Sequence, residues 1–235
     1  MKFVCIICML AIAFPVFAGT WNDNFDDGDL DGWSVYNYSG GTSVWEVENG
    51  QVRIERSHIY ASAAILDNSI GWKDYEISFD AMIDKTLNPD VSFVLISARV
   101  SENSGNTNHV GPALAYNWNG SRKIMYGLAK KGAQELNLSF FDEDPYPVEL
   151  SKWYRIKLSA MGNKYQFFVD DVLQKEFTLS GYESGGVMMG AGGCVAYLDN
   201  VTITGNDIPN GGSGITSVQS KMTLPIVWGG LKTGQ

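Results

Sequence analysis

Cysteine and histidine are scarce in this sequence. The 235 residues include three cysteines and two histidines. Cys5 and Cys8 lie within residues 1–18, whose positively charged start, apolar run and small-residue end at Ala18 predict a secretory signal peptide. Cleavage would leave only Cys194, which excludes an intramolecular disulfide and a cysteine-based metal site. We therefore expect Cys194 to be a small buried side chain.

The sequence also has few positively charged residues and few long apolar runs. Lys and Arg number 17 against 26 Asp and Glu, for a net charge of -9. Loss of Lys2 with the signal peptide makes this -10 (-9 minus 1). An acidic chain is repelled by nucleic acid and by anionic membranes, so these are poor partners. The net charge does not argue against neutral sugars as ligands. After residue 18 no apolar stretch is long enough to span a membrane, so we predict a secreted or cell-surface protein.

No segment shows sustained helical periodicity; alternation with a period of two dominates instead. Residues 75–84 alternate apolar and polar, which predicts a half-buried antiparallel strand. Residues 91–100 are apolar on both faces, as in a central strand of stacked sheets. Asn49-Gly50 between alternating segments predicts a tight hairpin, and residues 153–178 predict a three-stranded meander. The fold class predicted is all-β, an antiparallel two-sheet sandwich of the jelly-roll type.

The predicted domain covers residues 20–205, with an acidic turn at 24–33 near its start and a strand at 196–205 as its end. A Gly- and Asn-rich linker is predicted at 206–214 and an apolar tail at 215–235. Two interpretations of the tail stay open: a strand that folds back on the sandwich, or a docking or sorting tag. Residues 135–140 predict a further strand, and Asp142-Glu143-Asp144 a charged loop.

Several segments together resemble a known family. They are residues 23–33, Trp153-Tyr154-Arg155-Ile156-Lys157-Leu158, Gly162-Asn163, Val169-Asp170-Asp171 and Leu198-Asp199-Asn200-Val201-Thr202-Ile203. Over residues 20–205 the chain resembles the concanavalin A-like lectin/glucanase (laminin-G-like) superfamily. Within it the chain is similar to bacterial secreted domains of the 3-keto-disaccharide hydrolase type and to fructan-binding modules. The resemblance implies a jelly roll and a bacterial source. It is weak for function, because this fold hosts lectins, hydrolases and adhesion modules.

The aspartates near both ends of the domain suggest a cation site. The resemblance implies that many such sandwiches hold a structural calcium between their first and last strands. Calcium prefers several oxygen ligands, and Asp23, Asp26 and Asp199 are the candidates, with Asp27, Asp29 and Asp31 close by. The alternative is that these aspartates make solvated turns.

Aromatic and amide side chains in predicted loops suggest a sugar site. Sugar rings stack on aromatic faces while Asn and Arg bind their hydroxyls. The candidate stacking residues are Tyr36, Tyr38, Trp45, Tyr60, Tyr116 and Trp118. The predicted site consists of Trp118, Tyr116, Arg99, Asn117 and Asn119, whereas Trp33, Trp72 and Trp153 are assigned to the core.

Catalytic motifs are absent from the sequence. It has no Glu-x-Asp-x-x-Glu strand motif of sandwich glucanases and no Gly-x-Ser-x-Gly elbow. The leading hypothesis is a secreted, non-catalytic carbohydrate-binding or adhesion module. The alternatives are a glycan-active hydrolase of the 3-keto-glycoside or glucanase type and a cell-surface structural protein recruited through its tail.

Overall fold

A computed structural model describes residues 19–104, 107–130 and 139–212. Within these ranges the chain is all strands and turns, with no helix, and hence no helix long and apolar enough to cross a membrane. The strands are β1 (Gly19–Asp23), β2 (Trp33–Asn37), β3 (Val44–Glu48), β4 (Gln51–Arg56), β5 (Ser62–Leu66), β6 (Tyr75–Thr86), β7 (Val91–Val100), β8 (His109–Trp118), β9 (Ser121–Ala129), β10 (Ser139–Pro145), β11 (Trp153–Met161), β12 (Lys164–Val169), β13 (Val172–Thr178), β14 (Gly186–Gly192) and β15 (Cys194–Gly205).

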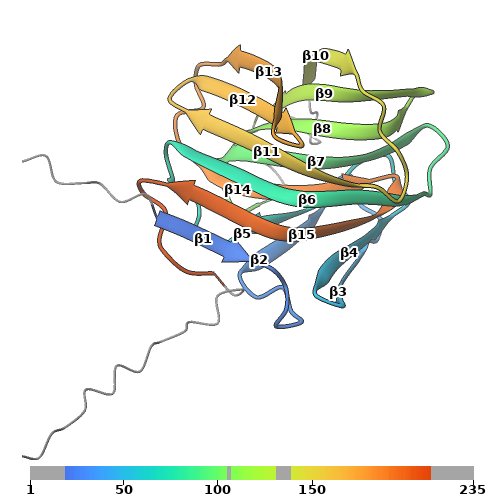
Figure 1. The fold of residues 1–235 in the computed structure, drawn as a ribbon, viewed down its shortest axis with the longest axis horizontal. Helices are drawn as coiled ribbons and strands as arrows, with labels where there is room; N and C mark the ends of the chain where they lie inside the picture. Colours follow the sequence, from blue (N-terminus) through green and yellow to red (C-terminus); the bar gives the residue numbers. More distant parts are fainter. Residues whose placement is uncertain (1–18, 105–106, 131–138, 213–235) are drawn as a thin grey trace, which may run out of the picture.

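The strands form two antiparallel sheets packed face to face (Figure 1). The eight-stranded sheet has the order β13-β12-β11-β6-β15-β4-β3, and β1 also pairs with β15. The seven-stranded sheet has the order β10-β9-β8-β7-β14-β5-β2. Seven of the thirteen strand pairings join strands that are not consecutive in the chain, as in a jelly roll. The predicted all-β sandwich is confirmed.

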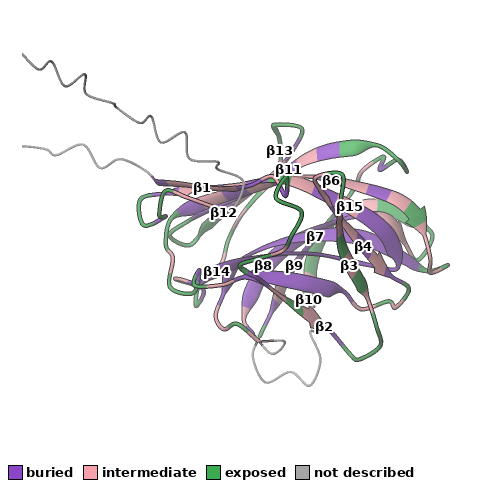
Figure 2. Cartoon of the chain, turned by 90° about the horizontal axis from the view of Figure 1, so that it is seen from below, coloured by how far each residue is buried: buried purple, intermediate pink, exposed green. Residues whose placement is uncertain are grey.

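The main core lies between the two sheets. Ile77, Phe79 and Ala81 of β6 alternate inward and are at most 1% exposed. Val94 and Ile96 of β7 meet them from the other sheet in the same cluster. Burying one such side chain contributes roughly 2 kcal/mol, so this layer is the principal stabilising feature. Figure 2 shows the buried residues concentrated on the strands that face across the sandwich.

Several local predictions are confirmed. Asn49 and Gly50 both have positive φ, 54° and 74°, which suits the two-residue turn between β3 and β4. Residues 91–100 are buried on both faces, and β11, β12 and β13 form the predicted meander. Cys194 is a buried free cysteine.

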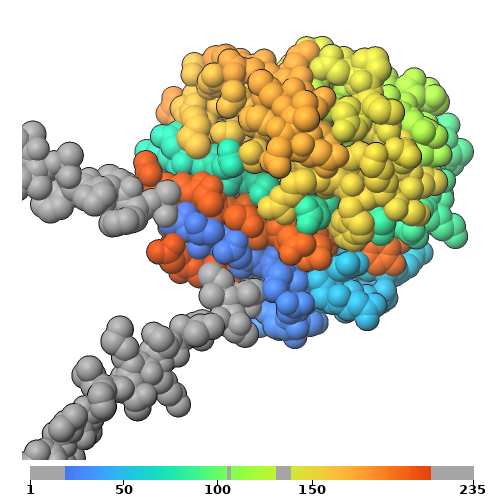
Figure 3. All heavy atoms as spheres, in the orientation of Figure 1, coloured from blue at the N-terminus to red at the C-terminus, as the bar shows by residue number. Residues whose placement is uncertain are grey.

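The first and last strands lie side by side. β1 pairs antiparallel with β15, with Asp23 opposite Val201, and the N-terminal half of β15 pairs with β4. In Figure 3 the blue N-terminal strand lies directly against the red C-terminal strand. The two ends of the domain are therefore joined by backbone hydrogen bonds.

Residues 206–212 differ from the predicted linker. Ile208 is 4% exposed in the core. The backbone of Gly211 exchanges hydrogen bonds with β1, accepting from Asn22 and donating to Thr20. The described part of the segment thus extends the domain beyond Gly205, because β1 offers it a free backbone edge. The signal peptide and the apolar tail lie outside the described residues.

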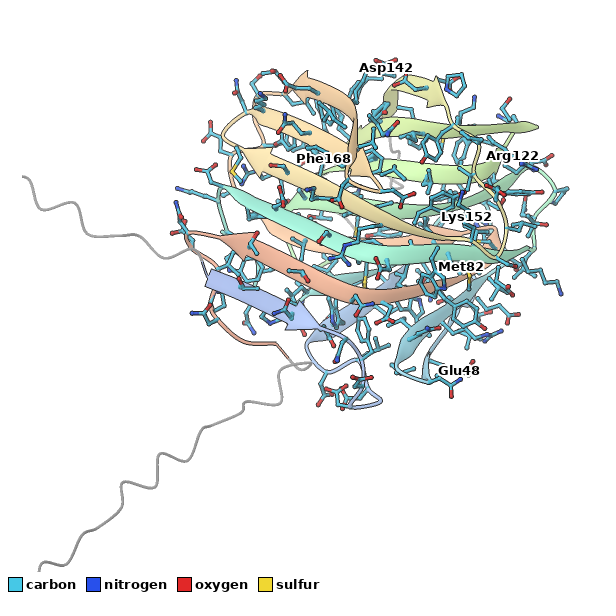
Figure 4. All side chains as sticks on the ribbon, viewed as in Figure 1. Glu48, Met82, Arg122, Asp142, Lys152 and Phe168 are labelled. Atoms are coloured by element: carbon cyan, nitrogen blue, oxygen red, sulfur yellow. The ribbon has the colours of Figure 1, made fainter. Side chains whose placement is uncertain are left out.

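Two further predictions need correction. Trp153, assigned to the core, is 37% exposed, because it opens β11 and alternation turns it to the outer face. Asp142-Glu143-Asp144, assigned to a loop, lies in β10, where Lys123 pairs with Glu143 and Lys175 pairs with both aspartates. Most of the predicted strand at 135–140 lies outside the described residues. Figure 4 shows Asp142 at the end of the sandwich where the edge strands β10 and β13 lie, and Met82 and Phe168 on the eight-stranded sheet.

Candidate functional site

The outer face of the seven-stranded sheet carries a second apolar cluster. Strand alternation sends Phe93 and Leu95 of β7 away from the main core, and Met188 of β14 joins them. Their neighbours on this face include the small residues Ala63 and Ala113. Large apolar side chains beside small ones make a hollowed surface, and such a surface on a sheet's outer face is a candidate binding site.

A cavity of about 350 Å³ opens over this cluster. Its described lining consists of Tyr38, Ile59, Tyr60, Ala61, Val91, Phe93, Leu95, His109, Trp118, Asn119, Phe140 and Met188. His109, Met188, Leu95 and Phe93 are at most 3% exposed and form the floor, whereas Asn119 is exposed at the mouth. None of these residues is Asp, Glu, Lys or Arg, so the described lining carries no formal charge when His109 is neutral.

Aromatic rings surround the pocket. Trp118 lies edge-on to Phe93 and to Phe140, with ring centroids 5.6 Å and 5.1 Å apart. Tyr60 stacks on His58 at 5.4 Å. The Tyr38 hydroxyl donates to the sulfur of Met188 over 3.3 Å, and burial raises the pKa of Tyr38. The pocket is thus bounded by rings held in place by one another.

A β-bulge decides the direction of Trp118. The register of β8 shifts between Ala115 and Trp118 against its neighbour β9. Trp118 therefore packs with the outer-face cluster, while Tyr116, two residues earlier, packs against the core between the sheets. Without the shift, residues of equal parity would share a face.

His109 is the titratable imidazole of the pocket floor. It is fully buried, and burial lowers its pKa to about 3, so the ring is neutral at physiological pH. Neither ring nitrogen has a hydrogen-bond partner among the described residues. A neutral imidazole offers one donor and one acceptor. The buried ring therefore has unused hydrogen-bonding capacity, although its nitrogens have no accessible surface.

The structure brings together only part of the predicted sugar site. Trp118 and Asn119 line the pocket. Asn117 is held in the turn, where its side chain donates to Pro89 O over 2.6 Å and accepts from Gly120 N over 2.8 Å. Tyr116 stacks under Arg122 instead.

Arg99 does not reach the pocket. Its guanidinium is fully buried and donates to the carbonyl oxygens of Ala160 and Gly162 over 3.0 and 3.2 Å. A positive φ of 62° and a nearby register shift in β7 turn it toward the other sheet. This corrects the expectation that Arg99 and Trp118 share one groove.

Sequence reasoning missed Phe93, Phe140 and His109 as pocket residues. One signal was available: a strand apolar on both faces implies that its second apolar face meets something other than the core. Tyr38 and Tyr60, among the wider set of candidate stacking residues, do line the pocket, whereas Tyr36 and Trp45 are not among its lining residues.

The aspartates proposed as calcium ligands are only partly gathered. Both carboxylate oxygens of Asp23 accept hydrogen bonds, one from Phe25 N over 3.0 Å and one from Trp33 Nε1 over 2.9 Å. Partial burial raises the pKa of Asp199, and the negative charges of Asp80 and Asp26 raise it further. In the part of the chain that the structure describes, no three His, Cys, Asp or Glu residues are arranged to hold a metal ion. Calcium therefore stays a prediction.

The two sheets, with an open pocket on the outer face of one of them, define a jelly-roll sandwich of the concanavalin A-like kind. The chain belongs to the family of the 3-keto-alpha-glucoside-1,2-lyase-like domain, whose model matches residues 20–204. The family predicted from the sequence is thus confirmed.

Three solved structures with the same fold are distant from this chain in sequence. The carbohydrate-binding module CBM66 from Bacillus subtilis is 16% identical, with a TM-score of 0.53 over 74% of this chain and 96% of the module. The laminarinase from Flavobacterium sp. UMI-01 is 11% identical, with a TM-score of 0.56 over 79% of this chain and 99% of the enzyme. The carbohydrate recognition domain of Emp47p is 10% identical, with a TM-score of 0.59 over 78% of this chain and 93% of that domain. At these identities the likeness establishes the fold alone. A search of curated protein sequences finds no significant match.

Proposed function

We propose that this protein is a secreted carbohydrate-binding module and that the pocket formed by Trp118, Phe140, Tyr60, Tyr38 and His109 is its sugar site. The observation that supports this most strongly is an uncharged pocket bounded by aromatic rings. Sugars present apolar C–H faces that pack on such rings, while their hydroxyls need a few fixed polar partners. The family name and the names of the fold neighbours, which include a carbohydrate-binding module, agree with a glycan partner.

The arrangement favours binding over glycoside hydrolysis. Glycosidases generally place two carboxyl groups on either side of the scissile bond. The described lining of this pocket contains no carboxylate. A general base works best when its pKa is near the working pH, and the pKa of His109 lies far below it.

A catalytic role remains the second candidate, because the family is named after a lyase acting on 3-keto-glucosides. Incubation with 3-keto-glucosides and with β-glucan oligosaccharides, followed by analysis of the products, tests it. Turnover that Trp118→Ala abolishes would replace the binding proposal by an enzymatic one.

The binding proposal is tested with a glycan array followed by titration calorimetry on retained glycans. Trp118→Ala should weaken binding about five- to thirtyfold, because stacking on an aromatic ring contributes about 1 to 2 kcal/mol. Trp153→Ala is the matched control: it removes a tryptophan that is 37% exposed on the other sheet. No retained glycan at millimolar concentration, or equal losses in both variants, would contradict the proposal.

A second pair of variants uses two neighbours on β10. Phe140 packs on Trp118 at the pocket, whereas Phe141 packs on Phe177 of the other sheet. Phe140→Ala should therefore weaken glycan binding and Phe141→Ala should not. Both remove the same side chain from adjacent positions, so the comparison separates the pocket from general effects on the strand.

A further inference from the structure

The polar side chains that a ligand can reach lie at the rim of the pocket. Asn119 is exposed there, and Tyr60 and Trp118 are partly exposed. The other two polar side chains of the described lining are not offered to a ligand, because the Tyr38 hydroxyl is directed at a sulfur atom and the nitrogens of His109 have no accessible surface. Sugar hydroxyl groups therefore have their partners at the rim.

The described side chains inside this rim present apolar groups. Ala61 and Val91, each 7% exposed, and Phe93 lie at the base of the hollow. The ring of Phe93 lies over β14, where a Cβ atom at Gly192 would stand 2.8 Å from it. Ile59, which is 44% exposed, continues the apolar surface to the mouth. A hexose ring inside the rim would bury several hydroxyl groups against carbon, and each one without a partner weakens binding, commonly tenfold or more.

We propose that the pocket selects glycosides whose aglycone, the group attached at the anomeric oxygen, is an aromatic ring. The aglycone lies between Trp118 and Ile59 above Phe93. The sugar lies at the rim beside Asn119. This inference rests on the proposed function and names the ligand class of the same site.

The walls and the size of the hollow favour an aromatic ring over an aliphatic chain. Trp118 already meets Phe93 and Phe140 edge-on, and a ligand ring extends this arrangement with the geometry that aromatic pairs prefer. The cavity volume of about 350 Å³ is at the lower end for ligand pockets, which suits one ring beside the sugar.

The test is a ligand series measured by titration calorimetry on the full-length protein. It pairs the methyl and phenyl β-glycosides of glucose, galactose and xylose, and it includes phenol alone. For the sugar that binds, the phenyl glycoside should bind roughly tenfold tighter than the methyl glycoside, because much of the phenyl ring leaves water. Phenol should bind roughly tenfold or more weakly than the phenyl glycoside, since it lacks the hydroxyl contacts of the sugar at the rim.

Two isoleucines with almost equal exposure provide the matched variants. Ile59→Ser should reduce the preference for phenyl over methyl to about threefold, because it removes part of the apolar wall. Ile70→Ser should leave the preference unchanged, since Ile70 is 43% exposed and is not among the described lining residues. Both positions are exposed, so neither substitution should prevent folding.

The outcomes separate this inference from the proposed function. A methyl glycoside that binds as tightly as its phenyl counterpart, with both weakened by Trp118→Ala, would overturn the inference and leave the proposed function standing. An equal loss of the phenyl preference in Ile59→Ser and Ile70→Ser would also overturn the inference alone. Failure of every glycoside to bind, or phenol binding as tightly as the phenyl glycoside, would overturn both.

Discussion

The buried guanidinium of Arg99 on β7 donates a hydrogen bond to the carbonyl oxygen of Ala160 on β11, over 3.0 Å, and so joins one sheet to the other. The same side chain donates to Gly162 O over 3.2 Å and to Trp72 O over 3.4 Å. The pattern of residues 91–100 predicts a central apolar strand, yet its penultimate residue is the charged Arg99. Arg99 is therefore a structural residue, and its partners show why it does not serve the pocket.

Arg99→Met should lower the free energy of unfolding by about 3 kcal/mol or more, because three carbonyl groups at the sandwich end lose their donor. Chemical denaturation measures this. Arg122→Met is the control, since Arg122 is exposed, stacks on Tyr116 and hydrogen-bonds its hydroxyl. Arg122→Met should lower the free energy of unfolding by less than about 1 kcal/mol. Equal effects of the two substitutions would show that the inter-sheet hydrogen bonds contribute little.

Asp23 is expected to stabilise the domain without a metal. Asp23→Ala removes the acceptor for two buried donors, Phe25 N and Trp33 Nε1, at a cost of about 2 to 4 kcal/mol. Asp27→Ala changes an exposed turn residue and should stay within about 0.5 kcal/mol. Thermal melts in EDTA compare the two. A cost that appears only when calcium is present would assign Asp23 to a metal site instead.

A substitution of Asp199 distinguishes the predicted calcium site from the alternative that these aspartates make solvated turns. Burial and nearby carboxylates raise the pKa of Asp199, so the folded state disfavours its charge. In EDTA, Asp199→Asn should therefore raise the melting temperature at pH 7, and the gain should vanish in acid, where Asp199 is protonated in both states. If calcium raises the melting temperature of the unaltered protein and Asp199→Asn cancels that rise, the predicted cation site exists.

His109 should make the protein sensitive to mild acid. Its pKa is about 3 when folded and about 6.5 in an unfolded chain, so the unfolded state binds the extra proton between these values. Stability should be complete above about pH 6.5 and fall by about 1.4 kcal/mol per pH unit below it, down to about pH 3. Denaturation as a function of pH measures the slope.

The matched variants for this slope are His109→Leu and His58→Gln. His109→Leu should remove its contribution to the slope, and His58→Gln should preserve it, because His58 lies outside the pocket lining and is not fully buried. Identical pH profiles for His109→Leu and the unaltered protein would show that the imidazole is solvated.

Much of the architecture could be predicted because its signals are local. The alternation of residues 75–84, the Asn49-Gly50 turn and the meander of β11, β12 and β13 depend on near neighbours in the chain. The site could be predicted only in part. Of the residues predicted for a sugar site, Trp118 and Asn119 line the pocket. Tyr116 and Arg99 do not, because bulges change the face to which a strand residue points.

The sequence by itself determined the all-β class, the family and the burial of Cys194, since composition and alternation are properties of the chain. Only the tertiary structure decided which outer face is hollowed and what lines it. Phe93, Tyr38, Phe140 and Met188 come from strands or loops far apart in sequence, and the strand order and register of the seven-stranded sheet bring them together. The burial of His109 likewise depends on the tertiary structure, because residues from other strands surround its side chain.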